Sequence, residues 1–334
     1  MSLSTSLSGR RTTTLAVVSL FTLTSCGLVE GSEDDSGPAA QGYPVTVENC
    51  GAEVAFDREP ENVVLLKSAA VPFLADLDAL DRVGTRAGEY PREYYDDQTW
   101  EQLKEIPALT GKTDAGGHLQ ISKEVVIDRE PDLVLGEVEN LDRGTLKSVS
   151  IPLLEEPGLC EEGIDEPGFD DVFSQMEMYG DVFNRADEAQ AATADLKQRL
   201  AGLESRADGE NRTAAVLYPT IGGGVTYAYG TRSMAHPILE AAGFEDVFAE
   251  VDKRVFEVSL EELLSRDPDV LVLLHPGDEE KQVVDAVTDL PGAASLTAVR
   301  NDDVMPLLFN YAEPPTPLSV DGLEKVIDHF EETS

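Results

Sequence analysis

Two stretches of this chain repeat one pattern of residues at a fixed spacing. The first holds Ser122–Glu124 and, four residues later, Arg129–Leu135; the second holds Ser259–Glu261 and, four residues later, Arg266–Val272. Matched residues are 137 positions apart throughout. A repeat at a constant offset indicates that one structural unit was used twice. Two copies this far apart favour two similar lobes over a solenoid.

Each copy of the repeat predicts a capped helix followed by a buried strand. Ser122 and Ser259 are N-cap candidates, because a serine oxygen accepts from the free N–H groups of a first helical turn. Glu262 would complete a capping box with Ser259. Each helix must end before its proline, Pro131 or Pro268, because the residue before a proline is disfavoured in helical space. Apolar runs typical of a strand buried on both faces follow at Leu133–Leu135 and Val270–Leu274.

Strands and helices alternate along the rest of the chain, which predicts an α/β fold with mainly parallel sheets. We expect a first lobe at residues 44–168 and a second at 210–334. Between them, residues 169–209 carry apolar residues on one helical face and predict a connecting region with one long crossover helix. A helix of about 20 residues spans roughly 30 Å, the width of a small domain. Such a connector predicts limited closure of the lobes.

The first 25 residues have the pattern of an export signal. Arg10 and Arg11 precede a short apolar core, Leu15–Leu23, which is too short to span a membrane. The residues Leu23-Thr24-Ser25-Cys26 resemble a bacterial lipoprotein signal, which implies cleavage before Cys26 and lipid attachment to its sulfur. An ordinary signal peptide with a chance cysteine is the alternative. Residues 26–43 then predict an acidic, flexible tether.

Cys50 and Cys160 remain once Cys26 is assigned to lipidation. An even pair of cysteines in an exported protein suggests a disulfide. It would tie the strand that enters the first lobe to the loop that leaves it. Two free thiols are the alternative.

The charge balance is strongly acidic, with 65 acidic and 25 basic residues and a net charge of −40. Nucleic acid is excluded as a partner, because its phosphates need a basic surface. The acidic residues are dispersed, which predicts a solvated surface that resists association and therefore a monomer. An acidic patch that faces a basic partner is the alternative.

No catalytic motif is present: the sequence has no nucleophile elbow, phosphate-binding loop or metal triad. We therefore expect a binding protein without a cofactor, and not an enzyme. The four histidines lack the spacing of metal ligands, so no metal site is predicted. They are His118, His236, His275 and His329.

Ligands of open α/β sheets bind beyond the carboxyl ends of the strands, so the loops at those ends hold the candidate binding residues. Tyrosines offer flat faces with a polar tip, and arginine offers a planar fork. This combination suits a bulky, rigid, anionic chelate, although the predicted cleft is not obviously basic. The alternative is that most of these tyrosines are core or rim residues. The candidates are Lys67, Glu89, Tyr90, Tyr227, Tyr229, Arg232, His275 and Tyr311.

Together, the two predicted lobes, the crossover helix, the lipoprotein signal and the paired units resemble a known family. It comprises the substrate-binding lipoproteins of ABC importers for iron-siderophore complexes and cobalamin, which have the class III periplasmic-binding-protein fold. The resemblance covers about Val45 to Phe330. It implies a monomer, lipid-anchored outside the cytoplasmic membrane, that delivers a ferric siderophore to an importer's permease and ATPase. It also implies that Glu124 and Glu261, one on each lobe, dock onto arginines of the permease; stabilising helix dipoles is their alternative role.

The same resemblance leaves the cargo open. Cobalamin, haem or another bulky anionic cofactor is the alternative to a ferric siderophore. A chelatase-like enzyme, which can share this bilobal fold, and a structural surface protein are the alternative classes.

Overall fold

The strand of the first repeat, Leu133–Leu135, lies between two other strands of the first lobe's sheet. The computed structural model describes residues 42–332 except 114–117, 210–211, 223 and 278–279. Four parallel strands lie in the order β4-β3-β5-β6. Their bounds are Val63–Leu65 for β3, Val83–Arg86 for β4, Leu133–Leu135 for β5 and Leu153–Leu154 for β6.

The second lobe places its copy of the repeat in the same way. β11 (Val270–His275) lies between β7 (Thr213–Pro219) and β12 (Val304–Leu308), and all three run parallel. The short β9 (Glu245–Asp246) pairs with the start of β7, as β4 pairs with β3. Leu133 pairs with Val63, and its counterpart Val270 pairs with Ala214. The prediction of two similar α/β lobes is therefore confirmed.

Two further strands of the second lobe differ from the expected pattern. β8 (Thr226–Tyr229) pairs antiparallel with β7, and β10 (Val255–Val258) pairs antiparallel with β8. Threonine and tyrosine suit a pleated strand, and β8 has strands on both sides to bond its backbone. The sheet is therefore mixed, and the predicted loop at 227–229 is wrong because these residues belong to a strand.

An aspartate after each repeated proline fixes the first strand of its lobe. The Asp132 carboxylate accepts from the N–H groups of Glu61 and Asn62, both at 2.9 Å. The Asp269 carboxylate accepts from the Thr213 N–H at 2.9 Å and from the Thr213 hydroxyl at 2.8 Å. In both lobes the bonds join the residue before the central strand to the chain that enters its neighbour. The repeated Pro-Asp pair thus has a structural role.

The helical half of each repeat begins at the predicted serine. Ser122 accepts from the Val125 N–H at the start of α3 (Lys123–Ile127), and Ser259 accepts from the Glu262 N–H at the start of α8 (Leu260–Arg266). The Glu262 carboxylate forms an ion pair with Arg266 at 3.3 Å. The other helices of the lobes are α1 (Val71–Asp76), α2 (Asp97–Glu105), α4 (Arg143–Lys147), α7 (Ala235–Ala241), α9 (Glu280–Thr288), α10 (Thr297–Asn301) and α11 (Leu318–Glu332).

A hairpin of β1 (Val45–Asn49) and β2 (Ala52–Phe56) comes first among the described elements. Cys50 in its turn forms a disulfide with Cys160, with the Cα atoms 5.4 Å apart, as predicted. The predicted tether at 26–43 is too long, because Tyr43 is buried and its hydroxyl donates to the Val182 carbonyl at 2.6 Å. The predicted signal peptide and Cys26 lie outside the described residues.

The connecting region holds α5 (Phe169–Val182) and the long helix α6 (Ala186–Arg206), which contacts α1 in the first lobe and α11 in the second. From α6, Arg199 forms an ion pair with Asp321 of α11 at 2.5 Å, and Arg206 pairs with Asp328. One cluster of buried apolar side chains extends from the first lobe through α5 and α6 into the second. The predicted crossover helix is confirmed, and this shared core supports a stiff connector.

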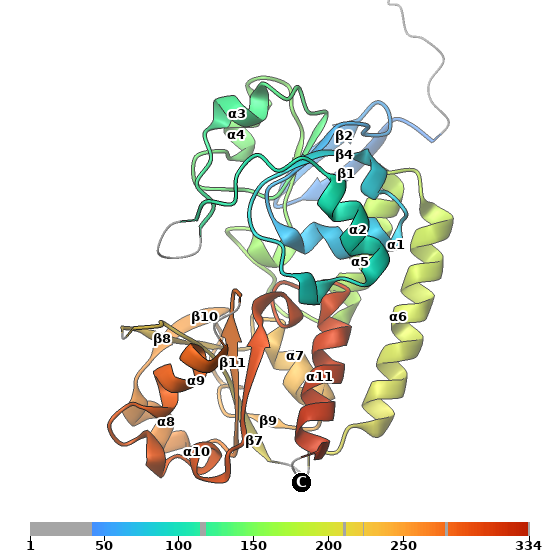
Figure 1. Ribbon diagram of the computed structural model, residues 1–334. Helices are drawn as coiled ribbons and strands as arrows, with labels where there is room; N and C mark the ends of the chain where they lie inside the picture. Colours follow the sequence, from blue (N-terminus) through green and yellow to red (C-terminus); the bar gives the residue numbers. More distant parts are fainter. Residues whose placement is uncertain (1–41, 114–117, 210–211, 223, 278–279, 333–334) are drawn as a thin grey trace, which may run out of the picture. The chain divides into compact units, whose positions relative to one another are not determined.

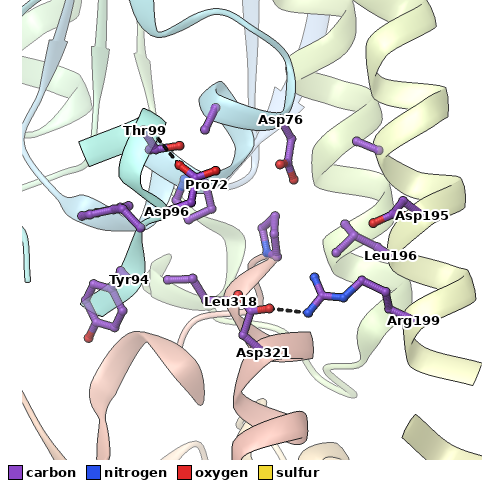
Figure 2. A pocket seen from close by; sticks show the side chains of 14 residues that line it. Pro72, Asp76, Tyr94, Asp96, Thr99, Asp195, Leu196, Arg199, Leu318 and Asp321 are labelled. Carbon is purple, nitrogen blue, oxygen red and sulfur yellow. Dashed lines mark hydrogen bonds and ion pairs between the residues drawn. The ribbon is translucent and has the colours of Figure 1, made fainter. Parts of the chain in front are cut away.

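A hollow of about 280 Å³ lies where α1, α6 and α11 meet (Figure 2). Its walls carry four carboxylates and one arginine, Arg199, which bonds Asp321 (Figure 2). Asp76 comes from α1, Asp195 from α6 and Asp321 from α11, while Asp96 caps α2. The hollow therefore gathers like charges from both lobes and from the connector.

The pKa of the Asp76 carboxyl is raised from 3.8 to about 6. Burial is the largest cause, followed by the Asp321 carboxylate; Arg199 opposes them, and Asp195 and Asp96 add to the rise. Solvent reaches this side chain through the hollow, yet protein atoms surround it closely. Because the folded protein holds this proton more tightly than the unfolded chain, its stability falls as the pH rises from about 4 to about 6.

We predict that Asp76→Asn raises the melting temperature at pH 7.5, because it removes a charge that the fold disfavours. A gain of roughly 2 °C is expected after allowance for solvent screening. The gain should shrink at pH 4.5, where the wild-type carboxyl is largely protonated. Thermal unfolding at the two pH values measures the difference, with Asp128→Asn, an aspartate outside the hollow, as the control. An equal shift at both pH values would contradict the assignment.

Candidate functional site

The carboxyl ends of the two sheets meet at Asn310, which follows β12. Its side-chain amide donates to the Ser68 hydroxyl after β3 at 3.0 Å, and its backbone N–H donates to the Tyr94 hydroxyl at 2.9 Å. Figure 1 shows the parallel strands of the second lobe pointing toward the first. We use the name strand-end site for the loops at these ends. It comprises residues 66–68, 87–90, 136–138 and 155–156 of the first lobe and 219–222, 224–232, 275–277 and 309–313 of the second.

In the first lobe, the site is built around an ion pair between Lys67 and Glu155. Glu155 is only 2 % exposed, and its carboxylate also accepts from the N–H groups of Glu137 and Glu156, both at 2.8 Å. The Asn49 side chain fixes the backbone of Glu155 by accepting from its N–H at 3.0 Å and donating to its carbonyl at 2.8 Å. Glu155 is thus the counterion of Lys67, and its buried carboxylate is held in place by hydrogen bonds from the backbone.

The next residue, Glu156, is also buried but has no cationic partner at its carboxyl group. It accepts from the Tyr179 hydroxyl at 2.8 Å and from the Gln175 amide at 3.1 Å. Burial raises the pKa of Glu156 to about 8, and the Tyr179 hydrogen bond opposes this rise. Burial therefore favours the uncharged form of Glu156.

In the second lobe, arginines are paired in the same manner. Arg232 forms an ion pair with Asp165 of the loop before α5, and it donates to the Glu162 carbonyl at 3.1 Å. Arg254 binds the buried Glu313 carboxylate through two nitrogens, at 2.6 and 2.7 Å. These pairs join segments that are far apart in the sequence and neutralise both guanidinium groups.

Four predicted binding residues have side chains in the interior, so the expectation that they offer a binding surface is corrected. The Tyr90 hydroxyl donates to the Ala87 carbonyl at 3.0 Å, and the Tyr311 hydroxyl donates to the Glu93 carbonyl. Tyr229 is buried near Glu313, and His275 bonds the Gly277 carbonyl. Each of these phenol or imidazole groups hydrogen-bonds to a backbone carbonyl or packs in the protein interior. Their exposed fractions are 8 % for Tyr90, 5 % for Tyr229, 2 % for His275 and 4 % for Tyr311.

The other four predicted residues are accessible in the strand-end site. Glu89 is exposed, and Lys67, Tyr227 and Arg232 are partly exposed. Lys67 and Arg232 carry their charges within ion pairs. The accessible surface thus offers a tyrosine face, two neutralised cations and a carboxylate.

The predicted docking residues Glu124 and Glu261 occupy matching places on the two lobes. Each lies in the first turn of its helix, α3 or α8, and each is exposed. Val125, beside Glu124, is 40 % exposed. A carboxylate with an exposed apolar neighbour is suited to a protein contact.

Three acidic residues that form ion pairs with cations in or beside the site were not among the predicted ones. Glu155 follows β6 directly, so it could have been predicted in the same way as the other candidates, from its place at the carboxyl end of a strand. Glu313 lies just beyond the loop after β12, and Asp165 lies in an acidic loop without any pattern. Their partners are 59 to 88 residues away, and no spacing in the sequence indicates them.

Among the described residues, no group of three or more His, Cys, Asp or Glu side chains is placed to hold a metal ion. Within that same part of the chain, every helix is too short or too polar to span a membrane.

Comparisons with known proteins agree with this architecture. The family model described as periplasmic binding protein matches residues 63–310. A solved structure of an ABC-type Fe3+-hydroxamate transport system from Saccharomonospora viridis is 53 % identical, covers 86 % of this chain and 99 % of its own, and has a TM-score of 0.83.

Curated relatives are more distant. A cobalamin-binding protein of Halobacterium salinarum is 23 % identical over 87 % of this chain and 75 % of its own length. The Fe(3+)-citrate-binding protein YfmC of Bacillus subtilis is 24 % identical over 87 % of this chain and 88 % of its own. The chain belongs to the periplasmic binding protein family, whose members are extracytoplasmic substrate-binding proteins of transport systems and not enzymes.

Proposed function

We propose that this protein captures a ferric hydroxamate outside the cytoplasmic membrane and delivers it to an ABC importer. The observation that carries the proposal is the 53 % identity to the hydroxamate transport protein of Saccharomonospora viridis over 86 % of this chain. The strand-end site supports it, because it combines a partly exposed tyrosine with cations that are already neutralised. The cargo binds there, with Lys67, Glu89, Tyr227 and Arg232 as its first candidate contacts.

Cobalamin is the second candidate cargo, favoured by the similarity of 87 % of this chain to a cobalamin-binding relative. Those relatives are much less similar than the hydroxamate protein, so the ferric hydroxamate is preferred.

Docking to the permease is assigned to Glu124 and Glu261. The two positions are equivalent, because a glutamate lies in the first helical turn of the repeated unit in each lobe. A receptor that presents both lobes to a permease needs one contact on each, and these exposed carboxylates are suited to basic partners.

We predict that cells lacking this protein lose uptake of radioactive iron supplied as a ferric trihydroxamate. The wild-type gene should restore uptake, whereas the Glu124→Ala, Glu261→Ala double variant should bind the chelate normally and fail to restore it. The matched control changes two exposed glutamates of other helices, Glu105→Ala with Glu280→Ala, and should restore uptake. Undiminished uptake in the deletion strain would contradict the receptor role. Normal uptake with the double variant would contradict the docking role alone.

The lipid anchor is assigned to Cys26 on its position after the apolar core of the export signal. Several acyl chains at one cysteine would hold the protein at the membrane, since each buried CH2 contributes about 0.8 kcal/mol.

We predict that Cys26→Ser moves the protein from the membrane fraction to the soluble fraction, because the acyl chains have no sulfur to join. Fractionation followed by intact-mass measurement checks this. An unchanged distribution, with no lipid mass on the wild-type protein, would remove the anchor.

A further inference from the structure

The charges of the strand-end site share one feature: every Lys and Arg in it is already paired with a carboxylate of the same chain. Lys67 pairs with Glu155, and Arg232 pairs with Asp165. Arg254, which approaches the site from the start of β10, is bound by Glu313. An anionic ligand would find no free cation among these three.

The pair at Lys67 is held from both sides. Glu155 is buried and accepts three hydrogen bonds through its carboxylate, from Lys67, Glu137 and Glu156. The Lys67 stem packs against Gly136, where an added Cβ atom would lie 3.0 Å from the lysine Cγ. Turning the ammonium toward a ligand would leave a buried carboxylate unpaired, which is unfavourable.

The remaining charge of the site is negative. Glu89 is exposed and Glu137 is partly exposed, and the described residues give neither carboxylate an ion pair. Burial, Glu155 and Asp142 raise the pKa of Glu137. The nearby Arg86, at the end of β4, donates to the Leu103 carbonyl and lies over the Tyr90 ring, so its guanidinium is also engaged.

The net charge of the whole chain also disfavours an anionic ligand. With a net charge of −40, its field disfavours the approach of anions and favours that of cations at moderate salt. Ferric chelates differ in their net charge. A ferric ion held by three hydroxamates is neutral, and a pendant ammonium makes the complex cationic, whereas a ferric ion held by three catecholates carries three negative charges.

We infer that the strand-end site selects ferric chelates without net negative charge, and that Glu155 and Asp165 set this selectivity by neutralising Lys67 and Arg232. This inference rests on the proposed function and specifies its substrate class. It corrects the expectation of an anionic chelate, because the arginine and lysine on which that expectation depends have their own counterions.

The test is a titration of the full-length protein in detergent, followed by quenching of Trp100 fluorescence. The panel holds a neutral ferric trihydroxamate, a cationic one with a free amine, a ferric tris-catecholate, ferric citrate and cobalamin. We expect the wild type to bind the two hydroxamates and to bind the anionic chelates at least about tenfold more weakly. A tenfold change in affinity is the size expected when two unit charges lie about 12 Å apart in a medium with an effective dielectric constant of about 20.

Two variants test the assigned residues. Glu155→Gln should strengthen binding of the tris-catecholate at least about tenfold, weaken binding of the cationic hydroxamate, and leave the neutral one unchanged. Asp165→Asn should act in the same direction, and it keeps the test open if the buried substitution prevents folding, because Asp165 is exposed. Glu166→Gln is the control: it removes an exposed negative charge beside Asp165 that forms no ion pair among the described residues, so it releases no cation and its effect on the tris-catecholate should be smaller.

The outcomes separate the two claims. If the wild type binds anionic and neutral ferric chelates equally, the charge selectivity is overturned and the receptor role remains. If neither variant changes the selectivity, the assignment to Glu155 and Asp165 is overturned. If only cobalamin binds, or no chelate does, the proposed ferric cargo fails together with the inference.

Discussion

The carboxylate that precedes each central strand is the constraint on which both lobes depend. Asp132 and Asp269 accept from the backbone where β3 and β7 begin, and they bind these strands beside β5 and β11 in the same register. A parallel sheet in register delivers all its carboxyl ends to one edge. The site therefore exists because two buried strands start at matched levels in each lobe, and the repeated Pro-Asp pair accounts for that match.

Much of this architecture could be predicted from the sequence, because local rules decide it. The serine caps, the stop before proline and the apolar run specify helix, turn and central strand without reference to the rest of the chain. The disulfide followed from the count of cysteines in an exported protein. The strand β8 was missed because its short run with two tyrosines is compatible with a loop as well as with a strand. Its antiparallel pairing with β7 and β10, which the sequence does not show, makes it a strand.

The site itself was predicted less well, for a physical reason. Sequence position correctly indicated which loops lie at the strand ends, but it could not show which side chains turn inward. Tyr90 and Tyr311 satisfy carbonyl groups of the protein, and both contacts are tertiary. The ion pairs of Lys67 and Arg232 join residues 88 and 67 positions apart, so the loss of their free charge is invisible in the sequence. These two ion pairs are the basis of our inference that the ligand is a neutral or cationic chelate and not an anion.

The shared apolar core and the ion pairs from α6 to α11 join both lobes to one connector, so we expect only limited closure of the site. A site of this kind gains specificity from fixed charges more than from closure. The hollow between α1, α6 and α11 shows the contrast, because Arg199 pairs with Asp321 and, among the described residues, leaves Asp76 and Asp195 without an ion pair.

The most direct test of this account is a crystal structure of the protein with a bound ferric trihydroxamate. The account predicts the iron complex between the carboxyl ends of the two sheets, against Tyr227, with the Lys67–Glu155 and Arg232–Asp165 pairs intact. A complex in the hollow beside α6, or a Lys67 turned from Glu155 to the ligand, would contradict it.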